Sequence, residues 1–105
     1  MNARTLVFVY GTLRPGEGAA AYLGTVHSAR AAIVAGQLLK GPYYGARFSE
    51  SAEGIPGYVV EIDAERLPEL DNYEGPSYDR VEVTAHTLTG QVRCWSYMIL
   101  DGRWG

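Results

Sequence analysis

A short apolar segment near the N-terminus constrains the possible folds more than any other feature of the chain. Residues 5–10 read TLVFVY and are rich in β-branched and aromatic side chains on both faces of an extended chain. Such residues favour strands, and a strand that is apolar on both faces is buried on both. Gly11 ends the run. We therefore expect a central strand that leads into a tight loop over residues 11–16.

The remainder of the sequence predicts further strands and short helices. Three alanines in a row favour a short helix over residues 17–23, which Gly24 would stop. A glycine-proline-glycine pattern predicts a turn at residues 54–57. Thr89-Gly90 predicts the turn of a hairpin. The expected strands are residues 26–39, with a bend at Gly36, and residues 46–50, 58–62, 78–88 and 91–100.

A second helix is expected over residues 64–73. Asp63 is a suitable N-cap residue, and Gly75 is suited to the position after the helix end. Pro68 removes a backbone donor, so the start of this helix is expected to be irregular or of 3₁₀ type. These strands and helices do not alternate as βαβ units do. The pattern predicts one α+β domain over residues 1–105, with two or three short helices and a mixed, mostly antiparallel, partly closed sheet.

Charge and length exclude several function classes. The formal net charge is −3, and the nine basic residues are scattered, so no basic face is expected for nucleic acid or an anionic membrane. The apolar run near the N-terminus is shorter than a signal-peptide core or a membrane span. We expect a cytoplasmic protein.

Neither a disulfide nor a metal site is expected. Cys94 is the only cysteine, and its position in an alternating strand predicts a packed core side chain. His27 and His86 are isolated from other potential ligands, so no metal-ligand spacing is present.

The turn after the first strand is the first candidate site. It comprises Tyr10, Gly11, Thr12 and Leu13, and Arg14 adds a positive charge beside it. Glycine permits positive φ and close approach of a ligand to the backbone. Successive N–H groups in such a turn can converge on an anion. The alternative is that this is an ordinary turn at a strand end.

The second candidate is Glu74, at the end of the second helix. The negative end of the helix dipole and an apolar pocket would both raise its pKa, as a general acid/base requires. The alternatives are that Glu74 is a surface residue or pairs with Arg80. Asp71 is a rival carboxylate that could instead bond its own loop backbone. Tyr78 is a candidate for the pocket wall, although packing alone could explain it.

Taken together, these segments resemble the γ-glutamylcyclotransferase-like (AIG2-like) superfamily. Residues 7–14 (VFVYGTLR) resemble its opening signature, and residues 70–75 (LDNYEG), followed by Tyr78 and Arg80, resemble its second. Intervening segments of the family also resemble parts of this chain, namely residues 36–38, residues 41–43, which include Tyr43, and residues 55–62. The likeness runs in order along almost the whole chain.

The resemblance implies a small barrel-like α+β fold with a pocket at one end. It implies that Tyr10, Gly11, Thr12 and Leu13 bind a glutamyl group and that Glu74 is the general acid/base. By the same resemblance we expect Arg14, Tyr43 and Tyr78 to line the substrate site. The chain departs from the family in the residue after Tyr43-Tyr44, which is not proline, and in having Pro68. Both departures bear on pocket shape.

The implied reaction is an intramolecular aminolysis. The α-amine of a γ-glutamyl compound attacks its own γ-carbonyl, which gives 5-oxoproline and a released amine. A single carboxylate can move both protons, so no cofactor is required. One alternative is a non-catalytic module that binds a carboxylate metabolite in the same pocket. Another is a protein-interaction domain that uses exposed Trp95 and Trp104.

Overall fold

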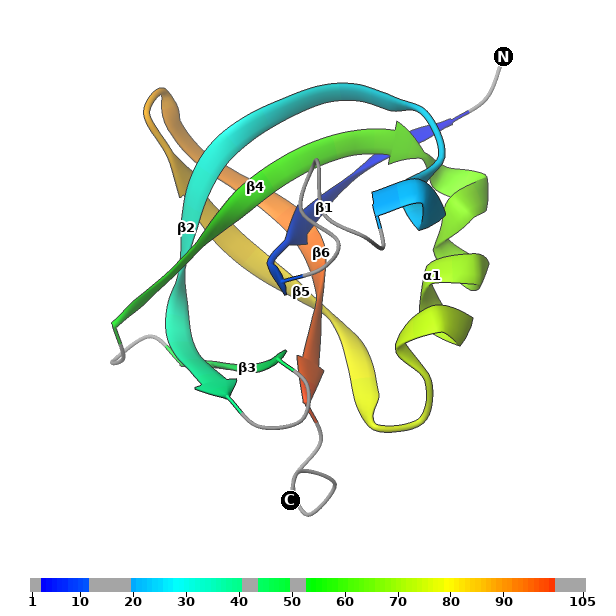
Figure 1. Cartoon of the computed structure of the whole chain (residues 1–105). Helices are drawn as coiled ribbons and strands as arrows, with labels where there is room; N and C mark the ends of the chain where they lie inside the picture. The colour runs from blue at the N-terminus through cyan, green and yellow to red at the C-terminus, as the bar shows by residue number, and fades with distance from the viewer. Residues whose placement is uncertain (1–2, 12–19, 41–43, 50–52, 100–105) are drawn as a thin grey trace.

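Six strands form one curved sheet in the computed structural model, which describes residues 3–11, 20–40, 44–49 and 53–99 (Figure 1). The spatial order of the strands is β3-β2-β4-β1-β6-β5, and a further pairing of β2 with β5 closes the sheet into a barrel. Only the β1–β6 pair is parallel among these pairings. The strands are β1 (Arg4–Val9), β2 (Val26–Lys40), β3 (Tyr44–Phe48), β4 (Gly54–Asp63), β5 (Tyr78–Thr87) and β6 (Gly90–Ile99).

One α-helix packs on the outside of this barrel. Helix α1 (Leu67–Glu74) follows the 3₁₀ helix η3 (Ala64–Arg66) and lies beside the 3₁₀ helix η2 (Ala20–Leu23). Figure 1 shows α1 running along one side of the barrel. The α+β class with a mixed, mostly antiparallel, barrel-like sheet is therefore confirmed.

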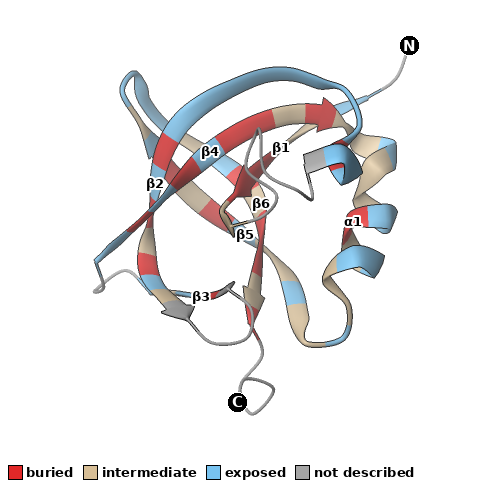
Figure 2. Cartoon of the chain, viewed as in Figure 1, coloured by how far each residue is buried: buried red, intermediate tan, exposed pale blue. Residues whose placement is uncertain are grey.

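The hydrophobic core consists of two clusters that share strand β1. Phe8 lies in the cluster inside the barrel with Val59 and Cys94. Val7 and Val9 lie in the cluster between the barrel wall and α1, which contains Leu70. Successive side chains of a strand point to opposite faces. This arrangement explains why residues 5–10 are apolar on both faces. Figure 2 shows the buried residues concentrated along β1, β4 and β6.

The expectation of a turn at residues 54–57 is wrong, because β4 begins at Gly54. The glycines there permit close packing and do not reverse the chain. A Cβ on Gly57 would lie 2.3 Å from the Val9 carbonyl oxygen. A Cβ on Gly54 would lie 2.3 Å from Cγ2 of Ile33. The expected bend at Gly36 coincides with a change of partner strand, because the pairing of β2 passes from β4 to β3 at that residue.

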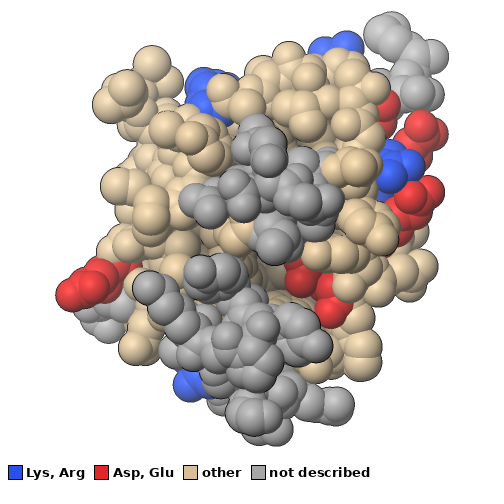
Figure 3. All heavy atoms as spheres, viewed as in Figure 1, with Lys and Arg blue, Asp and Glu red and all other residues tan. Residues whose placement is uncertain are grey.

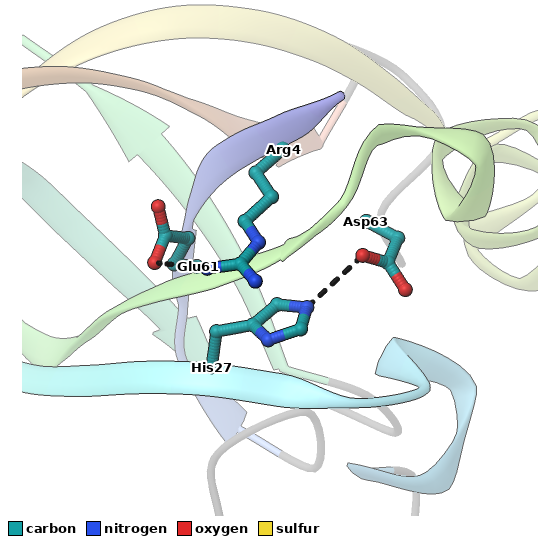
Figure 4. A network of polar contacts seen from close by, with 4 residues as sticks. All are labelled: Arg4, His27, Glu61 and Asp63. Atoms are coloured by element: carbon teal, nitrogen blue, oxygen red, sulfur yellow. Dashed lines mark hydrogen bonds and ion pairs between the residues drawn. The ribbon is translucent and has the colours of Figure 1, made fainter. Parts of the chain in front are cut away.

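The start of the second helix follows the sequence prediction in part. A 3₁₀ turn precedes α1, and Pro68 occupies its first turn, as expected. Asp63 holds the N-cap position of η3, but its side chain makes no capping hydrogen bond. Its Oδ1 lies 3.0 Å from Nε2 of His27 instead, and Arg4 pairs with Glu61 close by (Figure 4).

The C-terminal hairpin matches its prediction closely. Strands β5 and β6 pair along their whole length, from Tyr78–Ile99 to Thr87–Gly90. Cys94 is buried in the barrel interior, which confirms it as a core residue. Ser96 Oγ donates a 2.9 Å hydrogen bond to the Phe8 carbonyl and so joins β6 to β1. Residues 17–19 of the expected first helix lie outside the described residues.

Candidate active site

Strand β1 delivers Tyr10 and Gly11 to one end of the barrel. Gly11 has φ 65°, the left-handed conformation that only glycine adopts without strain, so the chain turns at this point. Tyr10 packs against Phe8 and Phe48 inside the barrel. Its hydroxyl donates a 2.5 Å hydrogen bond to the carbonyl of Tyr97. The first half of the predicted turn is thus held rigidly at the strand end.

Glu74 is the last residue of α1, as the sequence indicated. Gly75 follows with φ 78°, and its N–H donates a 3.0 Å hydrogen bond to the Asp71 carbonyl. This glycine ends the helix because a side chain would be strained there. Leu70 is fully buried and anchors the helix to the barrel wall. Glu74 therefore lies one helical turn beyond the anchored part of α1.

The Glu74 side chain is partly buried, and its carboxyl has no polar partner among the described residues. Burial raises its pKa to about 7 from an ordinary value of 4.5. Across the described residues, no hydrogen bond or ion pair involves this carboxyl. Arg80 pairs with Asp71 instead, Nε to Oδ1, at 3.2 Å. The alternative that Glu74 pairs with Arg80 is therefore wrong, and the Glu74 side chain is intermediate between buried and exposed.

Tyr10 lies close enough to both Glu74 and Tyr78 to interact with them electrostatically. Burial raises the pKa of the Tyr10 phenol well above its usual range, and the charges of Glu74 and Tyr78 add to this effect. The Tyr10 hydroxyl therefore stays protonated at physiological pH, and its proton is the one donated to the Tyr97 carbonyl. Three of the residues singled out in the sequence, from β1, α1 and β5, meet at one place.

Tyr97 is a member of this cluster that the sequence reasoning missed. Its hydroxyl donates a 2.7 Å hydrogen bond to Asp71 Oδ1. Burial raises the pKa of this phenol well above its usual range, and the hydrogen bond to Asp71 adds to the rise. Asp71 is thus bound by Tyr97 and Arg80, and not by its own loop backbone. Tyr97 lies directly across the ladder from Arg80, but this pairing depends on a hairpin register that the sequence pattern alone leaves open.

A hollow of about 290 Å³ adjoins these side chains. Its lining is Asp71, Tyr78, Asp79, Arg80 and Tyr97. Figure 3 shows acidic side-chain atoms at the edge of a hollow near the middle of the face that it presents. The space is large enough for a small polar group beside Asp71, although neither Glu74 nor Tyr10 is among its lining residues.

Several predicted site residues cannot be placed. Thr12, Leu13, Arg14 and Tyr43 lie outside the described residues, as does Trp104. Trp95 is half-buried, and the guanidinium of Arg80 lies 4.8 Å from the centre of its ring. That location removes Trp95 from the exposed aromatics on which a protein-interaction reading would depend.

Metal ligation and membrane insertion find no support in the described parts of the chain. Within residues 3–11, 20–40, 44–49 and 53–99, no three His, Cys, Asp or Glu side chains cluster as a metal site would require. No helix in those ranges is long and apolar enough to cross a membrane. On the face in Figure 3, the described basic side chains are separated from one another, as the scattered sequence positions suggested.

The raised pKa of Glu74 predicts a pH-dependent stability difference. A carboxyl whose pKa is about 7 when folded and 4.5 when unfolded contributes stability that is present below pH 4.5 and lost as pH rises through 7. Glu74→Gln removes this dependence. We expect urea unfolding to find the variant more stable than wild type by at most about 3 kcal/mol at pH 8.5, and nearly equal at pH 4.5. A stability difference that does not vary with pH would contradict the assignment.

Comparisons with known proteins agree with this fold. Residues 7–104 match the family model described as Gamma-glutamyl cyclotransferase, AIG2-like. A curated relative from Niallia circulans, γ-L-glutamyl-butirosin B γ-glutamyl cyclotransferase, is 31% identical over 102 residues. The match covers 88% of this chain and 65% of that relative, so the chain spans about two-thirds of its length.

Solved structures show the same architecture. An AIG2-like protein from Mus musculus superposes with a TM-score of 0.82 at 22% identity, over 96% of this chain and 82% of that one. YkqA from Bacillus subtilis superposes with a TM-score of 0.82 at 27% identity. That match covers 92% of this chain but only 36% of YkqA, so the domain occurs there within a longer protein.

Proposed function

Because this chain belongs to the γ-glutamyl cyclotransferase, AIG2-like family, we propose that it converts the γ-glutamyl group of a small molecule to 5-oxoproline, with Glu74 as the general acid/base. One observation carries the proposal. The Glu74 carboxyl is partly buried, has a pKa of about 7 and forms no hydrogen bond with any described residue. A carboxylate in that condition is available to exchange a proton with a substrate near neutral pH.

The reaction begins with removal of a proton from the substrate. The α-ammonium of the glutamyl group gives a proton to Glu74, and the free amine attacks the γ-carbonyl carbon. A new C–N bond closes a five-membered ring, and the carbonyl oxygen gains negative charge. Backbone N–H groups of the turn that begins at Tyr10 and Gly11 would stabilise that charge.

The second half of the reaction returns the proton. Glu74 donates it to the leaving nitrogen as the original amide C–N bond breaks. The carboxylate then takes the second proton from the ring nitrogen and passes it to the released amine, which yields 5-oxoproline and the amine as an ammonium ion. The carboxylate is regenerated, and no group outside the substrate and Glu74 gains or loses a proton overall. Holding the glutamyl chain folded for attack lowers the entropic part of the barrier. The neutral Tyr10 phenol donates its proton to the Tyr97 carbonyl, so its oxygen can orient the substrate only by accepting a hydrogen bond from it.

Release of 5-oxoproline from a panel of γ-glutamyl compounds tests the function. The panel should include a γ-glutamyl amino acid, the γ-glutamyl-lysine crosslink, a simple γ-glutamyl amine and γ-L-glutamyl-butirosin B, for which the Niallia circulans relative is named. We expect turnover of at least one. Ligand-dependent thermal stabilisation without turnover of any compound would overturn the enzyme proposal and favour the binding module.

The pH dependence of the same reaction gives a further prediction. Glu74 must be ionised to accept the first proton, so log kcat should rise with pH up to about 7 and then level, since the pKa of the carboxyl is about 7. Initial rates between pH 5 and 8.5 at saturating substrate measure this limb. A rise in log kcat centred near pH 4.5 would mean that the titrating group is an ordinary exposed carboxyl.

A further inference from the structure

Tyr97 forms hydrogen bonds to both halves of the candidate site. Its backbone carbonyl accepts the 2.5 Å hydrogen bond from the Tyr10 hydroxyl, at the turn. Its own hydroxyl donates the 2.7 Å hydrogen bond to Asp71 Oδ1, on α1. The side chain is only 3% exposed and packs in the cluster between barrel and helix. One residue of β6 therefore connects the turn to the helix that carries Glu74.

Asp71 is a firm attachment point for the end of α1. Two donors from the β5–β6 hairpin, the Tyr97 hydroxyl and Arg80 Nε, bind the same oxygen Oδ1. Arg80 is itself held against the ring of Trp95. The Asp71 carbonyl accepts the N–H of Gly75, so Asp71 also closes the turn that contains Glu74.

Helix α1 depends on such contacts for its position. It has eight residues and no side-chain N-cap hydrogen bond. A helix this short is marginal alone and is held by tertiary contacts. Leu70 supplies apolar burial, but burial does not fix the rotation of the final turn, because the hydrophobic effect is non-directional. The directional bond from Tyr97 to Asp71 supplies that constraint one turn before Glu74.

We propose that Tyr97 is a positioning residue, which fixes the Glu74 carboxyl against the turn at Tyr10 by holding Asp71 through its hydroxyl and Tyr10 through its carbonyl. The role in catalysis rests on the proposed function of Glu74. The geometric claim, that the hydroxyl keeps Glu74 buried, does not. When the hydroxyl is removed, the last turn of α1 loosens, water reaches Glu74, and its carboxyl returns toward ordinary acidity.

The titration of Glu74 itself is the measurement that reports this change. Tyr10 from β1 and Tyr97 from β6 have pKa values far above neutrality and stay uncharged. Tyr78 on β5 interacts electrostatically with Tyr10, and Arg80 of the same strand is paired with Asp71.

Arg66 and Glu69 form an ion pair on another side of α1. On the η2 and η3 side, Arg66 binds Glu69 and the Tyr22 carbonyl, and Tyr22 stacks on Tyr73. These contacts are separate from the Tyr97–Asp71 bond, so they are expected to stay in place when that bond is removed.

A carboxyl titration followed by ¹³C NMR tests the proposal without requiring activity. We expect the Glu74 resonance, assigned with Glu74→Gln, to titrate near 7 in the wild type and at least one pH unit lower in Tyr97→Phe. Phenylalanine retains the ring and the carbonyl that binds Tyr10, so only the bond to Asp71 is lost. Tyr58→Phe, the same change at a more exposed tyrosine on β4, should leave the titration unchanged. An unchanged titration in Tyr97→Phe would overturn the proposal.

A second pair of variants keeps the test valid should Tyr97→Phe fold poorly. Asp71→Asn and Asp71→Ala both remove the negative charge, but only asparagine leaves an oxygen to accept the Tyr97 hydroxyl. We expect the pKa of Glu74 to be higher in Asp71→Asn than in Asp71→Ala. Equal values would show that the hydrogen bond does not position Glu74.

Kinetic measurements then distinguish failure of this inference from failure of the proposed function. In an active enzyme, Tyr97→Phe should lower kcat by about 10- to 100-fold through misplacement of Glu74, with little change in KM. The acidic limb of its pH profile should move down with the NMR titration. Absence of 5-oxoproline release in the wild type would overturn the proposed function while leaving the NMR outcome to decide the positioning claim.

Discussion

Glu74→Gln is expected to lower kcat for 5-oxoproline release by about 10²- to 10⁴-fold, the usual contribution of a general acid/base. Glutamine retains the shape and polarity of the side chain but cannot accept the proton of the substrate amine. KM should change little, because Glu74 exchanges a proton with the substrate and is not assigned to hold its carboxylate. Initial rates of 5-oxoproline release at saturating substrate measure the effect.

Glu69→Gln is the matched control for this variant. Glu69 lies on the same helix, but its side chain is 59% exposed and pairs with Arg66. The same chemical change there should leave kcat within about twofold, because an exposed ion pair contributes at most about 1 kcal/mol to stability and is not assigned to contact the substrate. Wild-type turnover by Glu74→Gln would remove Glu74 from the mechanism, whereas equal losses in both variants would indicate damage to the helix.

Gly57→Ala should cause the largest loss of stability among simple glycine substitutions in β4. The added Cβ would lie 2.3 Å from the Val9 carbonyl oxygen and 2.8 Å from Cζ of Phe8. Neither group can move freely, because the Val9 carbonyl belongs to the backbone of the central strand and the Phe8 ring packs in the barrel interior. We expect a loss of about 3 kcal/mol, at the upper end of the usual cost of overpacking, measured by urea unfolding.

Gly54→Ala provides the comparison in the same strand. Its Cβ would also lie 2.3 Å from a neighbour, but that neighbour is Cγ2 of Ile33, whose side chain is half exposed and can rotate away. A loss of about 1 kcal/mol or less is expected. Similar losses for the two variants would show that contact with the β1 backbone is not what requires glycine at position 57. Because Val9 leads into Tyr10, the loss in Gly57→Ala should also reduce activity.

Local sequence patterns predicted the secondary structure where the physical cause is local. The alternation of residues 78–88, the Thr89-Gly90 turn, Pro68 and Gly75 each act over a few residues, and each produced the expected element. The prediction of a turn at residues 54–57 was wrong because glycines in a segment can serve either of two structural roles. Glycine permits a turn, and it also permits close approach of another strand, which only the partner strand reveals.

The candidate site shows the same division. The nature and order of Tyr10, Gly11 and Glu74 were readable from the sequence, because a glycine-ended strand and a glutamate at a helix end are local features. The role of Asp71 was not, since its partners Arg80 and Tyr97 are 9 and 26 residues away along the chain. Such pairs form only when the hairpin and the helix are docked together.

The sequence by itself determined that β1 is buried on both faces, that the chain turns at Gly11, and that α1 ends after Glu74. These follow from the side-chain and backbone preferences of neighbouring residues. Only the tertiary structure decided that Glu74 is partly buried and has no polar partner among the described residues, while Asp71 is bound to Tyr97 and Arg80. The physical reason is that desolvation and hydrogen bonding depend on which groups surround a carboxyl in space, and those groups come from four separate elements of the fold.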